Sequence, residues 1–154
     1  MAISPYVEQV RALIGHQLLL LPSVTVLPVD DAGRLLLVRH AHGGLWGVVG
    51  GGVDVDEHPA GAAVRETREE TGYDVEITAL VGNVGGPDYR VRYPNGDEAA
   101  YVSAVYAARV IGGVARPDGD ETTEVAWFDR DGLAELELNP LARALLRESG
   151  WLDG

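Results

Sequence analysis

Hydrophobic and polar positions along this chain follow helical spacing in some segments and extended patterns in others. Apolar side chains between Tyr6 and Ile14 recur at the spacing of one helix face, which predicts a leading helix. The runs Ser23–Val29 and Arg34–Val38 are rich in aliphatic and β-branched residues, which favour strands. Because the spacer Asp30-Asp31-Ala32-Gly33 is typical of a turn, these two runs are expected to form a hairpin.

A second helix is predicted from Pro59 to Thr71, after a glycine-dense stretch at residues 43–52. Proline suits the first turn of a helix, and Gly72 suits the left-handed position just past its end. Side chains three and four positions apart share a helix face. One face therefore carries the residues that we expect to pack against the rest of the protein: Ala60, Ala63, Val64 and Thr67.

Further extended runs predict strands on either side of this central helix in the sequence. After the helix they are Val75–Val81, Tyr89–Tyr93, Ala99–Val110 and Thr122–Phe128. Asn95-Gly96 favours a hairpin turn, and Pro140–Glu148 predicts a closing helix. This order indicates an α/β fold, a sandwich with a mixed β-sheet and helices on its faces. We expect residues 1–20 to form a helical extension and residues 21–154 a single domain.

Composition narrows the function classes without changing this architecture. The 154 residues, 46% of them hydrophobic, suit one globular domain, and the formal net charge is -12. An acidic chain lacks the basic face that a nucleic-acid polymer requires, so we expect no such partner. If the substrate is itself a polyanion, cations must bridge it to the protein, which is a first indication of metal.

Missing residue types exclude several chemistries. The sequence has no Cys, which excludes thiolate nucleophiles and Cys-ligated zinc, and no Lys, which excludes a Walker A loop and Schiff-base catalysis. The N-terminus lacks the basic start and apolar stretch of a signal peptide. Apolar runs such as Leu18–Leu21 are too short to span a bilayer, so we expect a cytoplasmic protein without a membrane partner.

Three acidic residues of the central helix are the main candidates for chemistry. Glu66, Glu69 and Glu70 are three and four positions apart, so their carboxylates project from one face and repel each other. A divalent cation would turn this repulsion into coordination, and oxygen ligands suit Mg²⁺ or Mn²⁺. An acidic surface helix explains the same spacing. Likewise, Gly50-Gly51-Gly52 fits either a ligand-facing loop with positive φ or a simple tight turn.

Taken together, these residues resemble the Nudix box. All seven of its fixed letters are present at the right spacing: Gly51, Glu57, Arg65, Glu66, Glu69, Glu70 and Gly72. Thr67 and Tyr73 stand where the box has aliphatic residues, and both keep enough apolar surface to pack. The resemblance covers most of residues 23–133. The chain is identified on these residues as a member of the Nudix hydrolase superfamily, with its MutT-like and ADP-ribose pyrophosphatase-like members.

The resemblance implies a Nudix-type α/β/α sandwich with the catalytic loop and helix on one face. It implies hydrolysis of the pyrophosphate bond in a nucleoside diphosphate linked to a moiety X, such as ADP-ribose or a nucleotide sugar. Mg²⁺, or Mn²⁺, would be held by Glu66, Glu69, Glu70 and a backbone carbonyl near Gly51. Arg65 looks like the ion-pair partner of Glu57. The catalytic candidates are then Glu66, Glu69, Arg65 and Glu121, with Glu57 and Gly72 supporting the box.

Each candidate outside the box has a plain alternative. Glu121, at the entry to a late strand, is a candidate to activate water. Alternatively, a box glutamate activates water and the loop that carries Glu121 is simply exposed to solvent. Arg90 and Arg92 share a strand face that would hold a phosphate or sugar, or would simply be exposed. Three aromatic residues are candidates to stack on a base: Trp46, Tyr89 and Tyr101. In a small domain, however, most aromatic side chains belong to the hydrophobic core.

Several readings stay open at the level of function. The box handles phosphates and not the leaving group, so removal of pyrophosphate from a nucleoside triphosphate is an alternative of the MutT type. A non-catalytic module that senses nucleotides often lacks box carboxylates, and all are retained here. The isomerase branch of the fold relies on a Cys that this chain lacks. The leading helix packs on its own domain or pairs with a second chain, which would make a homodimer.

Overall fold

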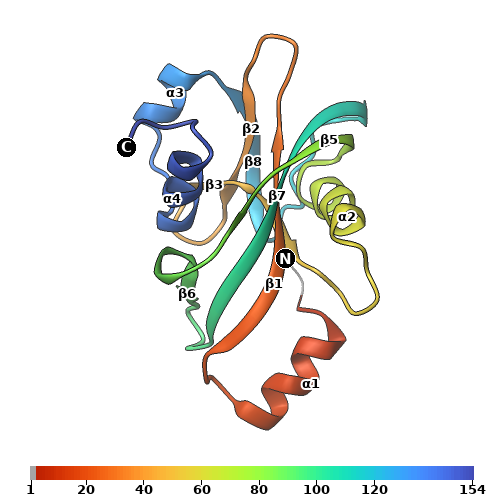
Figure 1. The fold of residues 1–154 in the computed structure, drawn as a ribbon, viewed down its shortest axis with the longest axis vertical. Helices are drawn as coiled ribbons and strands as arrows, with labels where there is room; N and C mark the ends of the chain where they lie inside the picture. The colour runs from red at the N-terminus through yellow and green to blue at the C-terminus, as the bar shows by residue number, and fades with distance from the viewer. Residues whose placement is uncertain (1–2) are drawn as a thin grey trace.

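Two β-sheets form the centre of the computed structural model, which describes residues 3–154 (Figure 1). The larger, mixed sheet has one parallel pair, β1 with β7, and is otherwise antiparallel. Its strands are β4 (Val49–Gly52), β1 (Leu19–Pro28), β7 (Glu98–Gly113) and β5 (Tyr73–Val84), in this order, and β6 (Arg90–Arg92), which pairs with β7. The smaller sheet is antiparallel, with the order β3 (Trp46–Gly47), β2 (Leu35–His40) and β8 (Thr122–Phe128).

Helices lie on both sides of the strands in Figure 1, which confirms the predicted α/β sandwich with a mixed sheet. On one side lies α2 (Pro59–Thr71), and on the other lie α3 (Arg130–Glu135) and α4 (Pro140–Glu148). Both α2 and α4 have the predicted bounds, because the proline that starts each helix is a local signal. The short helix α3, capped by Asp129, was not predicted.

The leading helix is present as α1 (Pro5–Ile14), one residue longer than predicted. The Ser4 hydroxyl caps it by accepting a hydrogen bond from the Val7 backbone N–H at 3.2 Å. No residue of α1 is buried, and Arg11 links it to the sheet through a bond from Nη2 to the Glu98 carbonyl at 2.7 Å. No helix among residues 3–154 is both long and apolar enough to cross a membrane.

The predicted hairpin between the first two strands is wrong, although its turn is correct. Asp30 Oδ1 closes the turn by accepting from the backbone N–H groups of Ala32 and Arg34 at 3.0 and 2.8 Å. Beyond one isolated bridge, Val29 to Leu35, the strands separate into different sheets. The reason is burial on both faces, since all of residues 35–38 are buried and β2 lies inside the protein between β3 and β8.

The strand predicted at residues 89–93 is shorter than expected. Tyr89 belongs to a 3₁₀ turn (Pro87–Tyr89), and its ring is buried while its hydroxyl donates to Glu148 of α4. Tertiary packing of this ring overrides the extended pattern at that position. The following hairpin from β6 to β7 forms as predicted, with Gly96 at φ +93° in its turn.

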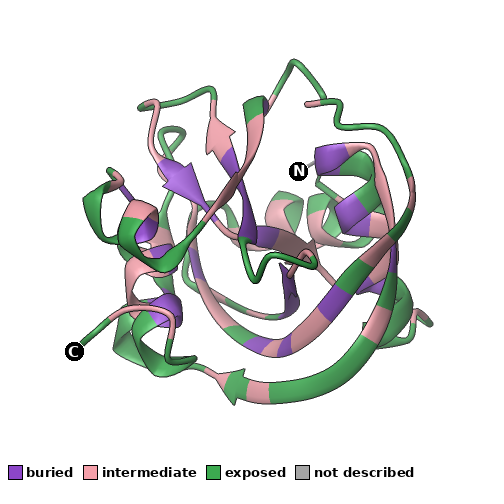
Figure 2. Ribbon diagram, turned by 90° about the horizontal axis from the view of Figure 1, so that it is seen from above, coloured by how far each residue is buried: buried purple, intermediate pink, exposed green. Residues whose placement is uncertain are grey.

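The buried residues form two clusters that face different helices. One includes Leu35, Leu37, Leu145 and Leu146 and lies under α4, whereas the other packs Ala62 and Ala63 of α2 onto strand valines. Along the long strand β7, buried positions are interspersed with more exposed ones (Figure 2). The second cluster fixes α2 against β1, β4 and β5, and so positions the acidic residues that α2 carries.

Candidate active site

The glycine triplet before α2 is a strand and not a turn. Residues 50–52 belong to β4 and pair with Ser23–Thr25 of β1, and none of the three glycines has a positive φ. The expectation of a left-handed glycine turn is therefore wrong, because the backbone is held extended by its partner strand. Gly50 is required for a different reason: a Cβ there would lie 2.2 Å from the carbonyl oxygen of Val24.

Two of the three candidate glutamates lie on the packed face of α2. Glu66 and Glu70 are only 2% and 5% exposed, whereas the side chain of Glu69 is 54% exposed. Of the residues predicted to pack, Ala63 and Thr67 are buried and Val64 is partly buried, whereas Ala60 is exposed and Ala62 is buried in its place. Burial of two carboxyl groups within one helical turn is costly unless another charge compensates it.

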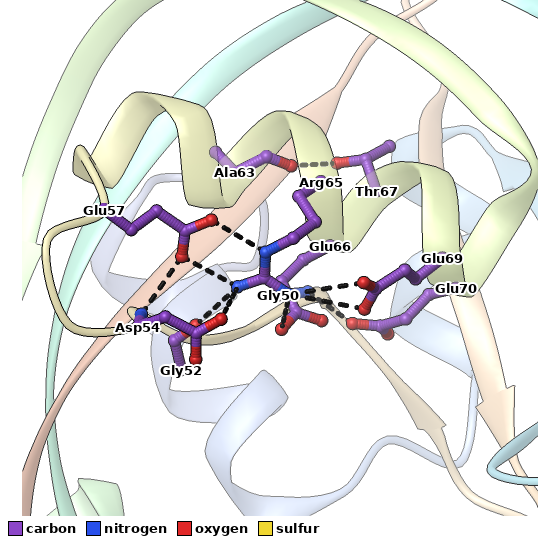
Figure 3. A network of polar contacts seen from close by, with 10 residues as sticks. All are labelled: Gly50, Gly52, Asp54, Glu57, Ala63, Arg65, Glu66, Thr67, Glu69 and Glu70. Carbon is purple, nitrogen blue, oxygen red and sulfur yellow. Dashed lines mark hydrogen bonds and ion pairs between the residues drawn. The ribbon is translucent and has the colours of Figure 1, made fainter. Parts of the chain in front are cut away.

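Arg65 supplies part of that charge and connects the helix to the preceding loop (Figure 3). Its Nε and Nη2 donate to the two carboxylate oxygens of Glu57 at 2.7 and 2.9 Å, and Nη2 also reaches the Gly52 carbonyl at 3.1 Å. Nη1 donates to Glu66 Oε1 at 3.0 Å and to Glu69 Oε2 at 3.3 Å. The ion pair implied between Arg65 and Glu57 is thus present and bidentate, the geometry that best fixes two segments together.

The structure adds one acid to this network that the motif does not contain. Asp54 Oδ2 lies 3.7 Å from Arg65 Nη2, and the Asp54 backbone N–H donates to Glu57 Oε1 at 3.0 Å. No spacing rule in the sequence indicates Asp54, because its position depends on the path of the loop.

The pKa values of three of the box glutamates are displaced, and not all in the same direction. Hydrogen bonds from Arg65 hold the pKa of Glu57 below its usual range. Burial raises the pKa of Glu66, against the opposing charge of Arg65. Burial, followed by the charge of Glu66, raises the pKa of Glu70 well above its usual range, although the Gly50 N–H donates to Glu70 Oε1 at 3.2 Å. The two buried carboxyl groups therefore lack enough positive charge.

A divalent cation would supply the positive charge that the buried carboxyl groups of Glu66 and Glu70 lack. Among residues 3–154, Glu66 Oε2 is buried without any hydrogen-bond partner, and hard carboxylate oxygens suit a divalent ion. No set of three acidic or histidine side chains in this part of the chain is already gathered around a common point. Arg65 explains this, because its Nη1 contacts both Glu66 and Glu69.

The C-terminal end of α2 is closed by a close contact between two backbone segments. Gly72 has φ +79°, and a Cβ on it would lie 2.3 Å from the Val114 carbonyl oxygen. Gly113, the last residue of β7, has φ +82°, and a Cβ on it would lie 2.3 Å from the Gly72 carbonyl oxygen. The supporting role expected of Gly72 thus has a physical cause, since both the left-handed backbone and the contact exclude a side chain.

Gly72→Ala is expected to destabilise the fold by about 1–2 kcal/mol from the left-handed backbone alone, with the carbonyl contact adding to that cost. Urea unfolding followed by circular dichroism measures this change. Gly61→Ala is the matched control, because Gly61 is inside α2 and its Cβ would meet only His58 Cβ at 4.0 Å. The control should be stabilised by about 0.5–1 kcal/mol. Equal stability of Gly72→Ala and the wild type would contradict this account.

The loop that carries Glu121 packs beside the C-terminal end of α2. Thr122 Oγ1 donates to the Glu70 carbonyl at 3.2 Å, and the Glu121 carbonyl accepts from the Ala41 N–H at 2.8 Å. Asp118 organises the loop, because its Oδ1 accepts from the backbone N–H groups of residues 120, 121 and 122 at 2.8, 2.8 and 3.0 Å. Glu121 is therefore on a segment that touches the acidic helix, as its predicted role requires.

The other candidates outside the box lie elsewhere. Arg90 and Arg92 are both exposed on β6, which Figure 1 shows across the long strands from α2, so the structure does not bring them to the acidic residues. Trp46 is 8% exposed and packs edge-on against Phe128, and Tyr89 is 2% exposed. These two rings are core, and stacking on a base is wrong for both.

Comparison with known proteins agrees with this fold and site. The family model of the NUDIX domain matches residues 19–148. A MutT-like protein of Streptomyces ambofaciens is 35% identical over 113 residues, which cover 73% of this chain and 66%, just under two thirds, of that protein. An ADP-ribose pyrophosphatase of Methanocaldococcus jannaschii is 32% identical over 130 residues, 82% of this chain and 73% of that protein. The crystal structure of a MutT NUDIX hydrolase from Burkholderia pseudomallei superposes with a TM-score of 0.69 at 29% identity, over 84% of this chain and 97% of that one.

The fold and the acidic loop and helix define a Nudix hydrolase domain. The chain belongs to the NUDIX family. This confirms the Nudix superfamily predicted from the motif. Nudix hydrolases generally use divalent metal ions, which agrees with the chemistry of the buried carboxylates.

Proposed function

We propose that this protein hydrolyses the pyrophosphate bond of a nucleoside diphosphate linked to a moiety X, of the ADP-ribose or nucleotide-sugar type, with Mg²⁺ as the metal. The products are a nucleoside monophosphate and phospho-X. The observation that carries this proposal is the buried pair Glu66 and Glu70, with Glu66 Oε2 unpartnered among residues 3–154, beside the exposed Glu69. A substrate polyanion approaching such an acidic group requires a bridging cation, which supports metal-dependent chemistry on phosphates.

The residues present suit distinct parts of this reaction. Glu66, Glu69, Glu70 and the Gly51 carbonyl would hold Mg²⁺, or Mn²⁺, which supplies charge neutralisation of the diphosphate and a more acidic bound water. Glu57 and Arg65 hold the loop and α2 in register, and Arg65 also restrains Glu66 and Glu69. Glu121 is the base proposed outside the box, and Glu69 is the most exposed of the box glutamates for the same role.

A second candidate function is removal of pyrophosphate from a nucleoside triphosphate. This second function is supported by the names of the Streptomyces and Burkholderia relatives, MutT-like and MutT. The name of the Methanocaldococcus relative, ADP-ribose pyrophosphatase, supports the first function, hydrolysis of a nucleoside diphosphate linked to X. A non-catalytic sensing module is disfavoured, because all the box carboxylates are present. The cytoplasmic location, the homodimer and the absence of nucleic-acid partners stay predictions from the sequence.

A substrate screen with product masses tests the proposal. Purified protein with Mg²⁺ is incubated with ADP-ribose, nucleotide sugars, dinucleoside polyphosphates and nucleoside triphosphates, in ¹⁸O-labelled water. We expect AMP and ribose 5-phosphate from ADP-ribose, and the labelled product identifies the phosphorus that water attacks. A Glu69→Gln preparation purified in parallel controls for contaminating hydrolases. Turnover of triphosphates alone would favour the second candidate, and no turnover of any compound with Mg²⁺ or Mn²⁺ would refute both.

A further inference from the structure

A polar cavity of about 430 Å³ opens beside Glu69, between the C-terminal end of α2 and the segment that follows β7. Its lining includes Arg68 and Glu69 of α2 and Arg116 and Asp118 of the facing segment. The cavity is therefore continuous with the exposed member of the three box glutamates. It has room for a small group adjacent to whatever Glu69 helps to bind.

Arg116 is held in this wall by its backbone and not by its side chain. Its backbone N–H donates to the Thr71 carbonyl at 2.7 Å, and its Cβ lies 2.9 Å from where a Cβ on Gly72 would be. Among residues 3–154 the Arg116 guanidinium makes no hydrogen bond or ion pair. The absence of a side chain on Gly72 thus allows a free cation to stand directly against the end of the box helix.

Arg68 is the second cation of the cavity and is only weakly engaged. Its one ion pair in the described part of the chain is with Asp74, at 3.5 Å, and the Arg68 side chain is 73% exposed. Such exposed ion pairs contribute about 0–1 kcal/mol to the stability of the fold. Arg68 can therefore leave Asp74 and bind another anion at little cost in free energy.

The acidic groups of the cavity do not neutralise these two arginines. Asp118 Oδ1 already accepts three backbone N–H bonds, and Asp118 forms no ion pair with either arginine among residues 3–154. Glu69 is directed to Arg65, with Nη1 at 3.3 Å from Oε2. In a chain with a formal net charge of -12, one guanidinium group without a partner among residues 3–154 and a second that is only weakly paired, both beside an acidic helix, are an exception that calls for an anionic ligand.

We propose that Arg68 and Arg116 bind a phosphate group of the substrate, the one that leaves with the X moiety. This inference rests on the proposed function, since it assumes a diphosphate held at the box glutamates. Planar guanidinium groups hold phosphate oxygens with paired donors, and two of them on facing segments enclose one phosphate from both sides. The carboxylate of Asp118, whose Oδ2 accepts no hydrogen bond among residues 3–154, is then available to a hydroxyl of X.

Metal-free binding tests this proposal independently of catalysis. The ¹⁵N-labelled full chain in EDTA is titrated with ribose 5-phosphate, with pyrophosphate and with ribose, and amide shifts are followed by NMR. We expect both phosphates to shift the amides of Gly72, Val114 and Arg116, and ribose to leave them unchanged. Arg116→Gln and Arg68→Gln should each raise the dissociation constant about tenfold, the effect of losing one charge-assisted hydrogen bond.

Arg147→Gln is the matched control. Arg147 is exposed on α4, and its guanidinium also has no partner among residues 3–154. It should bind both phosphates as the wild type does. Equal losses in Arg116→Gln and Arg147→Gln, or shifts confined to other surfaces, would overturn the proposal. If phosphate binds here while the substrate screen finds no hydrolysis, the proposed function fails and this site stands.

Discussion

Glu69→Gln and Glu70→Gln are each expected to lower turnover by at least about 10²-fold while the fold survives, as when a metal ligand is lost. Glutamine keeps the size of the side chain and removes the negative charge that a divalent ion requires. Initial rates at saturating Mg²⁺ on the best substrate of the screen measure the effect, and circular dichroism checks the fold. Glu135→Gln, an exposed acid on α3, is the control and should keep wild-type rates.

The two variants are also expected to differ from each other. Glu69 is exposed and Glu70 is buried, so excess Mg²⁺ or Mn²⁺ should recover more activity in Glu69→Gln, where water can fill the ligand's place. Wild-type-like rates in both variants would contradict the assignment of these carboxylates to the metal.

Glu70→Gln is further expected to stabilise the metal-free protein, increasingly so as the pH rises. The pKa of Glu70 is well above the value of 4.5 for an ordinary glutamate, because of burial and then the charge of Glu66. A carboxyl with a raised folded pKa contributes its full stability below the unfolded pKa and loses it as the pH rises through the folded pKa. A poorly compensated buried charge costs about 1–3 kcal/mol, which corresponds to roughly 2–12 °C in Tm for a chain of this length.

Thermal unfolding in EDTA between about pH 5 and pH 8 checks this prediction. The difference in Tm between Glu70→Gln and wild type should grow with pH, and Mg²⁺ should raise the Tm of the wild type more than that of the variant. Glu57→Gln is a control of opposite sign, because Arg65 holds the pKa of Glu57 low. It should destabilise the protein at neutral pH, and the difference should disappear in acid. A Glu70→Gln variant that follows the wild type at every pH would disprove the account.

Local signals in the sequence were sufficient for the helix that carries the site. Pro59 and Gly72 define its two ends, and the spacing of the box letters places the glutamates along it. Which glutamates are buried is not a local property. The orientation of α2 on the valine cluster decides it, and this orientation turns Glu66 and Glu70 inward while Glu69 stays exposed.

Contacts between distant segments account for what the sequence did not reveal. The pattern of residues 23–38 contains a good turn, but the choice of sheet for each strand depends on partners as far away as β7 and β8. The strand pattern of the sequence indicates Arg90 and Arg92, whereas Arg68 and Arg116 line a cavity that only folding creates. Arg116 follows a predicted strand by several residues and has no motif around it.

The two glycines at the end of α2, Gly72 and Gly113, also separate the alignment of the carboxylates from the selection of the substrate. Gly72 and Gly113 hold the backbone junction by contact alone, and Thr122 fastens the far end of the intervening segment to α2. Residues 114–121 are therefore tethered to α2 at both ends, and the Asp118 carboxylate fixes the backbone of residues 120–122. Residues 115–117, between the first of these anchors and Asp118, can therefore vary while the carboxylates of α2 stay aligned, so selectivity can change without rebuilding the catalytic helix.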